Sequence, residues 1–264
     1  MTIIQATVLG IVQGLTEFLP ISSTAHLHIF PWVLNWSEIP ASFDIALHFG
    51  SLIAILIYFF KDWIKLLVAG FNKTFKKEDS QEGKLFWYLV FATIPAGIIF
   101  FILDKVFEDI LRHELIIAIT LIVMGILLYI VDKKADSKFN LKNMTLKQAM
   151  LIGLAQVLAF IPGMSRSGST MTIGRLMEVD RESTAKFSFY LSTPMILAAT
   201  IYKFKDFSFD LNFVIGTITS FIVALLVIKF FMDYIKKGSY KVFAIYRVIL
   251  GLIIIGIYIV KLFV

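Results

Sequence analysis

The 264-residue chain contains no cysteine, and charged residues make up only 17% of it. The absence of cysteine excludes disulfide bonds and thiolate metal sites. Hydrophobic residues reach 58% and the mean hydropathy is +0.84, far from the balance of a soluble domain. The first sixty residues contain no lysine or arginine, so the N-terminus lacks the basic segment of a removable signal peptide. We therefore expect an integral membrane protein without a soluble domain.

Several apolar runs approach the roughly 20 residues that a helix needs to cross a bilayer. Inside lipid these runs must be helical, because exposed backbone groups find no water there. Two further apolar stretches, 3–19 and 146–162, are shorter, and each runs into a proline followed by serine-rich polar sequence. The six predicted spans are 45–60, 85–103, 115–131, 184–202, 213–231 and 243–263.

The two short stretches resemble each other. Q-A-T-V-L-G-I-V-Q begins at Gln5 and Q-A-M-L-I-G-L-A-Q begins at Gln148. After a shift of one residue, P-I-S-S at Pro20 is aligned with P-G-M-S at Pro162. This order along the chain indicates an internal repeat. We predict a single membrane domain, 1–264, built from two repeats at about 1–131 and about 146–264.

Loop charge predicts how the short stretches lie in the membrane. Six lysines occur in 61–84, five in 132–147 and four in 229–241, whereas 104–114 is mainly acidic. The positive-inside rule assigns the three basic segments to the cytoplasm. With these segments inside, the predicted spans place both termini at the exterior. All basic loops fall inside only if 146–162 enters the membrane and returns to the same side.

The predicted fold is therefore an all-α integral membrane protein with six transmembrane helices plus two re-entrant helix-loop-helix units in inverted-topology repeats. In such folds broken helices meet near the middle of the bilayer, where irregular backbone lines a polar cavity. The two serine-rich motifs should then face each other.

The first motif, Q-G-L-T-E-F-L-P-I-S-S-T-A-H, runs from Gln13 to His26. Gln13 and Glu17 are four residues apart, so they share one face of a helix. Pro20 ends that helix, and the hydroxyl groups that follow are suited to cap the next one, with His26 in its first turn. These hydroxyl groups belong to Ser22, Ser23 and Thr24.

The second motif, P-G-M-S-R-S-G-S-T, runs from Pro162 to Thr170 and contains Arg166. Backbone N–H groups at a helix start, hydroxyl groups and a guanidinium together form a phosphate-binding site. A carboxylate and an imidazole on the opposite side would add acid–base or metal chemistry. The hydroxyl groups belong to Ser165, Ser167, Ser169 and Thr170.

These residues also have a structural interpretation. Hydroxyl groups in membrane helices often bond to their own backbone, His26 could be a capping residue, and Glu17 and Arg166 could form a buried ion pair. An ionised side chain at bilayer depth costs at least ~2.5–3.5 kcal/mol, which favours a function for both. Asp44 and His48, four residues apart, would either support the cavity or lie at the membrane boundary.

The two motifs, together with F-A-I-Y-R at 243–247, make nearly the whole chain resemble the undecaprenyl pyrophosphate phosphatase family, the bacitracin-resistance type. Its members carry a Glu/Gln-x-x-x-Glu motif, here Gln13 to Glu17, and a P-G-x-S-R-S-x-x-T motif, here Pro162 to Thr170. They remove one phosphate from undecaprenyl diphosphate, which regenerates the lipid carrier for peptidoglycan and other envelope polymers. The resemblance implies a multi-pass hydrolase of the bacterial plasma (inner) membrane.

The resemblance implies a site made of Glu17, Ser23, His26, Ser165, Arg166 and Thr170, and our hypothesis for the mechanism gives individual residues these roles. Arg166 would hold the diphosphate and stabilise its charge. Ser23 would be the nucleophile with His26 as its general base, and attack by water that His26 activates remains an alternative. Glu17 would orient His26 or help hold Mg²⁺ or Ca²⁺, although Gln13 is a poorer ligand than a second carboxylate. The catalytic residues are thus Glu17, Ser23, His26 and Arg166, and the substrate-binding residues Gln13, Ser22, Thr24, Ser165, Ser167 and Thr170.

A lipid-phosphate flippase or transporter is the alternative function, because inverted repeats with broken helices are a transporter architecture. Translocation needs phosphate binding but no nucleophile beside a base, so the presence of Ser23, His26 and Glu17 favours hydrolysis. The expected partners are a polyprenyl diphosphate lipid and the membrane, without nucleic acid, and a homodimer is left open.

Overall fold

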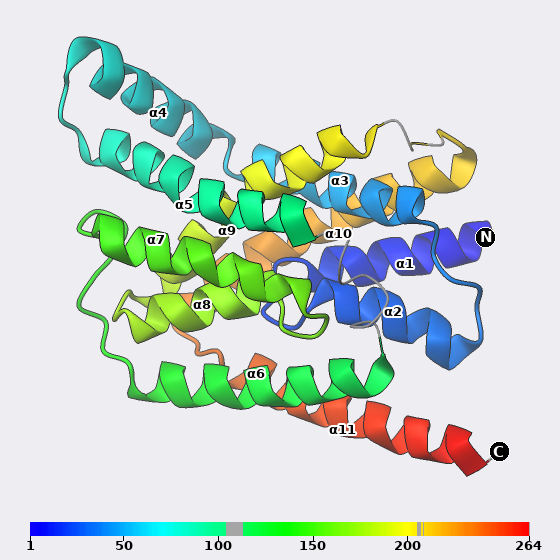
Figure 1. Cartoon of the computed structure of the whole chain (residues 1–264). Coiled ribbons are helices and arrows are strands. Elements are labelled where there is room, and N and C mark those ends of the chain that lie inside the picture. Colours follow the sequence, from blue (N-terminus) through cyan, green and yellow to red (C-terminus); the bar gives the residue numbers. More distant parts are fainter. Residues whose placement is uncertain (104–112, 205–206, 208, 264) are drawn as a thin grey trace.

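The computed structural model describes residues 1–103, 113–204, 207 and 209–263. Helices make up most of this part of the chain and run side by side in one bundle (Figure 1), as the sequence predicts. Residues 104–112 of the mainly acidic segment 104–114 lie outside the described residues. In chain order the elements are α1 (Ile3–Thr16), α2 (Ser23–Leu34), α3 (Ala41–Tyr58), α4 (Phe60–Phe71), η1 (Asn72–Lys76), α5 (Gln81–Leu103), α6 (Glu114–Lys134), α7 (Leu146–Leu154), η2 (Ala155–Phe160), α8 (Arg166–Leu176), α9 (Arg181–Tyr202), α10 (Leu211–Ile235) and α11 (Lys241–Phe263).

Within the described part of the chain, five helices are long and apolar enough to cross a membrane, namely α3, α5, α6, α10 and α11. The sixth predicted span, 184–202, lies in α9, which has 22 residues but a more polar composition. Most of the side chains along the middle of α9 are buried inside the protein. Because α9 is surrounded by protein rather than lipid, it does not need the apolar composition of the other five.

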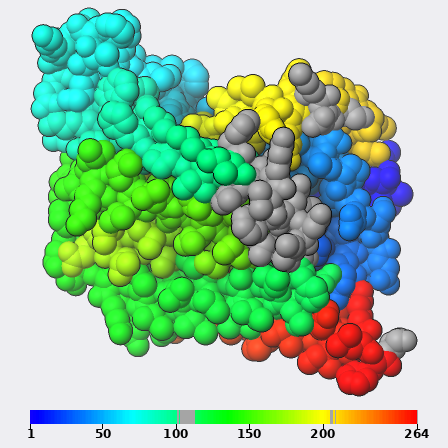
Figure 2. All heavy atoms as spheres, in the orientation of Figure 1, coloured from blue at the N-terminus to red at the C-terminus, as the bar shows by residue number. Residues whose placement is uncertain are grey.

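Helix α4 lies where the sequence predicted only a basic loop, 61–84. Its exposed apolar side chains share one face, and Lys61 and Lys65 lie beside them. This pattern is typical of a helix at a membrane surface. Figures 1 and 2 show α4 and the start of α5 standing out at one corner of the molecule. We did not predict this helix, because its lysines indicated a loop. Its exposed apolar residues are Phe60, Ile64, Leu67, Val68 and Phe71.

The two short units enter the bundle from opposite ends and meet in its middle. Helix α1 begins at the end where both chain termini lie, and α2 returns to that end (Figure 1). Helix α7 continues as the 3₁₀-helix η2 from the other end, and α8 returns there. This arrangement agrees with the predicted re-entrant units.

The two short units share local details. Thr2 and Gln5 form a capping box at the start of α1, and Thr145 and Gln148 form the same box at the start of α7. Helix α1 packs on α10, and α7 packs on α5. A Cβ atom at Gly153 would lie 2.3 Å from the carbonyl oxygen of Ala92, so α7 depends on glycine for its close approach to α5.

Candidate active site

A serine with positive φ stands at the start of both returning helices. Ser22, with φ of 76°, caps α2, and Ser165, with φ of 69°, caps α8. The hydroxyl of Ser22 accepts from the N–H of Ala25 at 3.4 Å, and that of Ser165 accepts from Gly168 at 3.1 Å. Such backbone costs on the order of 1–3 kcal/mol in a non-glycine residue and persists only where the surroundings hold it. The hydroxyl groups of Ser22 and Ser165 therefore cap these two helices, in agreement with the capping interpretation.

Glu17 joins the two motifs. Its carboxylate is buried, and Nη2 of Arg166 donates to its Oε1 atom. Its Oε2 atom accepts from the hydroxyl of Ser23 at 2.7 Å and from the amide of Gln13 at 3.1 Å. Nε2 of His48 lies 3.4 Å from the same oxygen. Three of the four predicted catalytic residues thus meet at one carboxylate, and the predicted ion pair with Arg166 is present.

His26 is buried on the same turn but has different partners. Its Nδ1 atom lies 2.6 Å from the carbonyl oxygen of Ser22, and its Nε2 atom lies 2.7 Å from the hydroxyl of Tyr246. Because a carbonyl only accepts, Nδ1 carries the proton, and Nε2 of the neutral ring accepts from Tyr246. In this arrangement Ser23 is hydrogen-bonded to Glu17, whereas His26 is held by Ser22 and Tyr246. The pairing of Ser23 with His26 therefore stays a prediction.

The remaining hydroxyl groups of the second motif mostly bind protein. Ser167 lies 3.1 Å from the hydroxyl of Ser165 and donates to the carbonyl oxygen of Leu19 at 2.9 Å, which ties α8 to the first motif. Thr170 donates to the carbonyl oxygen of Arg166 at 2.9 Å and lies 2.6 Å from the hydroxyl of Ser188. Thr170 therefore supports α8, whereas Thr24, at the start of α2, is exposed.

Three neighbours of the site were not among the predicted catalytic and substrate-binding residues, although His48 was named as a residue that could support the cavity. His48 contacts Glu17, and its i, i+4 relation to Asp44 was the available signal. Tyr246 contacts His26, and Arg247 binds the backbone of both motifs. Tyr246 and Arg247 belong to the F-A-I-Y-R stretch, which has no spacing that would have revealed their roles.

The side chains do not fit a divalent cation held by Glu17. Both carboxylate oxygens already accept hydrogen bonds, and a cation there would lie beside the guanidinium of Arg166. Gln13 turns its NH₂ group, not its oxygen, toward Glu17. The described residues contain no group of three or more histidine, aspartate or glutamate side chains arranged for a metal.

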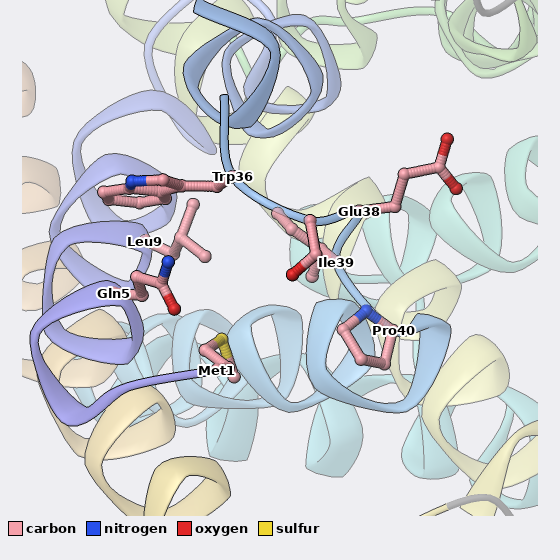
Figure 3. Close-up of a pocket in the computed structure, with 8 residues that line it drawn as sticks. Met1, Gln5, Leu9, Trp36, Glu38, Ile39 and Pro40 are labelled. Atoms are coloured by element: carbon pink, nitrogen blue, oxygen red, sulfur yellow. The ribbon is translucent and has the colours of Figure 1, made fainter. Parts of the chain in front are cut away.

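A separate pocket lies near the N-terminus, between α1 and the segment that precedes α3 (Figure 3). Trp36 and Leu9 contribute apolar surface there and Gln5 contributes polar atoms, whereas the carboxylate of Glu38 points away from them. None of the residues of the Glu17 site lines this pocket, so we assign it no part in the chemistry.

The Glu17 site can perform a recognisable reaction. A hydroxyl that donates to a carboxylate can lose its proton to that carboxylate as it attacks an electrophile. A guanidinium and the free N–H groups at a helix start can stabilise the negative charge of a phosphate. The geometry is therefore suited to phosphoryl transfer within the membrane bundle.

Comparison with known proteins agrees with this chemistry. Residues 6–253 match the family model "Bacitracin resistance protein BacA". The chain is 44% identical over 270 residues to an undecaprenyl-diphosphatase of Caldicellulosiruptor bescii, with 99% of each chain covered. It is 42% identical over 261 residues to an undecaprenyl-diphosphatase of Moorella thermoacetica, with 98% of each covered. The chain therefore belongs to the bacitracin resistance protein BacA family.

Proposed function

We propose that the protein hydrolyses undecaprenyl diphosphate to undecaprenyl phosphate and inorganic phosphate. The observation that carries this proposal is the hydroxyl of Ser23 hydrogen-bonded to Glu17, beside Arg166, where two broken helices meet inside a membrane bundle. Relatives that are named for this activity are 42–44% identical to the chain over nearly their full length. Such a reaction recycles the lipid carrier for peptidoglycan and other cell-envelope polymers.

The membrane bundle explains how a lipid diphosphate is handled. The polyprenyl tail remains in the bilayer, and only the charged headgroup needs to reach the polar break between the helices. Backbone N–H groups at the starts of α2 and α8 and the guanidinium of Arg166 supply donors there. A guanidinium has five N–H donors. Arg166 uses one of them to bind Glu17, so other donors remain for phosphate oxygens.

The first chemical step is attack by Ser23. As its oxygen bonds to the terminal phosphorus, its proton moves to Oε2 of Glu17 and the bond from that phosphorus to the bridging oxygen breaks. Undecaprenyl phosphate leaves with the electrons of that bond, and a phosphoserine remains. Arg166 stabilises the charge that spreads over the phosphoryl oxygens.

The second step is hydrolysis of the phosphoserine. Water attacks the phosphorus, the bond to the Ser23 oxygen breaks, inorganic phosphate is released and Ser23 regains a proton. Nε2 of His26, with the hydroxyl of Tyr246, offers a route for the proton of that water. Direct attack by water on the diphosphate gives the same products, and it predicts a different result for removal of the Ser23 hydroxyl.

A dependence on Mg²⁺ or Ca²⁺ fits this site only if the cation arrives bound to the diphosphate oxygens. Loss of phosphate release in EDTA, restored by either ion, would support that role. The plasma (inner) membrane is the proposed location, because lipid carriers of the envelope are used there. A homodimer stays a prediction.

Phosphate release in detergent tests the function. Purified protein in micelles is mixed with undecaprenyl diphosphate, and inorganic phosphate is measured against a Ser23→Ala variant. We expect one phosphate per lipid from the wild-type protein. The comparisons give no support to a flippase, and a micelle has no second compartment. Lipid binding without phosphate release would therefore contradict the proposed hydrolysis and favour transport.

A further inference from the structure

Arg247 is fully buried on α11, and its side chain contacts both broken helices. Nη1 donates to the carbonyl oxygen of Pro20 at 3.0 Å. Nη2 donates to the carbonyl oxygens of Gly163 at 2.6 Å and Met164 at 3.2 Å. Nε donates to the carbonyl oxygen of Leu121 in α6 at 3.3 Å. One guanidinium thus binds the turn before α2, the turn before α8 and a spanning helix.

All four acceptors of Arg247 are backbone carbonyls, and no described carboxylate forms a salt bridge with it. Arg175, which is also fully buried, instead pairs with Asp132 at 2.9 Å. Burying a charge without an opposite partner is costly, and such residues in membrane proteins are functional by default. The cost indicates that Arg247 does more than fill space.

The hydrogen bonds of Arg247 set the direction of the peptide groups before α8. In a trans peptide the C=O and the following N–H point in opposite directions. The carbonyl of Met164 faces Arg247, so the N–H of Ser165 faces away from it. The carbonyl of Pro162 accepts from Thr120 of α6 at 2.6 Å. Helices α6 and α11 therefore hold the carbonyls of this turn on one side and leave the N–H of Ser165 on the other.

The turns that Arg247 binds adjoin strained backbone. Ser22 and Ser165 both have positive φ, and Gly163 has φ of 89°. A Cβ atom at Gly163 would lie 2.0 Å from the hydroxyl oxygen of Thr120, so only glycine fits. Strained residues keep their geometry only when contacts over-determine it. The guanidinium of Arg247 binds backbone carbonyls of both turns, and the hydroxyl of Ser167 adds a second link between them through Leu19 and Ser165.

We propose that Arg247 is a positioning residue for the reaction, one that fixes the two turns relative to each other. Ser23 begins α2 directly after one turn, and Arg166 begins α8 directly after the other. Both must reach the same phosphorus, so their separation has to be constant. Arg247 acts through the backbone and does not touch the substrate. The inference rests on the proposed function.

Arg247→Lys is the test. Lysine keeps the charge but loses the planar fork, so one ammonium cannot bind the carbonyls of both turns. We expect hydrogen exchange to accelerate in peptides that cover 19–25 and 161–168 together. Because a misplacement of about 1 Å can cost roughly 10²-fold in rate, we expect kcat to fall by about that factor while KM changes little.

Arg175→Lys is the matched control, because Arg175 is equally buried and also binds backbone carbonyls. It lies at the far end of α8, about 14 Å from Arg166 at 1.5 Å per residue. This variant should lower the melting temperature and leave kcat per folded molecule and exchange in both turns unchanged. Gly168→Ala is a second variant, since its Cβ would lie 2.9 Å from Nη1 of Arg247. If Arg247→Lys does not fold, Gly168→Ala serves as the test instead, and its kcat should be lower than that of the wild-type protein.

Each outcome separates the inference from the proposed function. If the wild-type protein had no phosphatase activity, the proposed function would be contradicted. Hydrogen exchange would still report whether Arg247 holds both turns. Wild-type kcat and exchange in Arg247→Lys would overturn the inference. Faster exchange in only one turn, or equal losses of kcat in the two lysine variants, would also overturn it, because a general loss of stability would then explain the data.

Discussion

Removing the hydroxyl of Ser23 separates the two chemical routes. The hydroxyl donates to Glu17 at 2.7 Å, and Glu17 keeps Arg166, Gln13 and His48 when that bond is lost. A hydrogen bond to a charged group contributes on the order of 1.5–3 kcal/mol, so Ser23→Ala should cost no more than about that in stability. At ~2–4 °C per kcal/mol for a chain of this size, the melting temperature should fall by only several degrees.

The effect on the rate should be far larger. Loss of a nucleophile removes a rate factor of about 10⁴ or more, which corresponds to roughly 5.5 kcal/mol of transition-state stabilisation. Ser23→Ala should therefore bind undecaprenyl diphosphate, retain its fold and release almost no phosphate. Turnover, lipid binding and thermal melting in detergent measure these three properties on the same preparation.

Ser183→Ala is a suitable control, because Ser183 also donates its hydroxyl to a carboxylate, that of Asp180 at 2.8 Å, at the start of α9. It should lose a similar amount of stability and keep its turnover. Phosphate release by Ser23→Ala within about tenfold of the wild-type rate would refute the nucleophile assignment, and attack by water would then be the better account.

Three further results are expected. Arg166→Lys should lose roughly 10² or more in kcat because a point charge replaces the fork that binds phosphate oxygens; near-normal turnover would mean that the diphosphate is held elsewhere. A single cysteine at Lys76 should resist labelling from outside intact cells, and labelling there would overturn the predicted orientation. Burial raises the pKa of Asp62, but the hydrogen bonds of Lys186 and Tyr190 outweigh it and lower the pKa below 3.8. Its contribution is therefore present above pH 4 and lost as the pH falls, so Asp62→Asn should destabilise by under about 1 kcal/mol at pH 7 and by less at pH 3, as thermal melting can show.

Composition and periodicity alone determined the class of protein and most of its helices. Apolar runs of nearly constant length indicate an environment that forbids unpaired backbone groups. All six predicted spans accordingly appear as helices within a few residues of their expected bounds, five of them apolar enough to cross a membrane. The repeated Q-A-x-x-x-G-x-x-Q stretch and the two proline breaks placed Glu17 and Arg166 in facing units. Helix α4 was missed because a count of lysines cannot distinguish a loop from an amphipathic helix.

Only the tertiary structure decided which side chains meet. Sequence spacing reports neighbours on one helix, such as Gln13 and Glu17, but the contact of His26 with Tyr246 spans 220 residues. The positive φ of Ser22 and Ser165 turns the chain at each break, and no residue preference predicts that angle for serine. These turns direct Ser23 toward Glu17 and leave His26 to Tyr246, because hydrogen-bond partners across a bundle are chosen by helix packing and backbone direction.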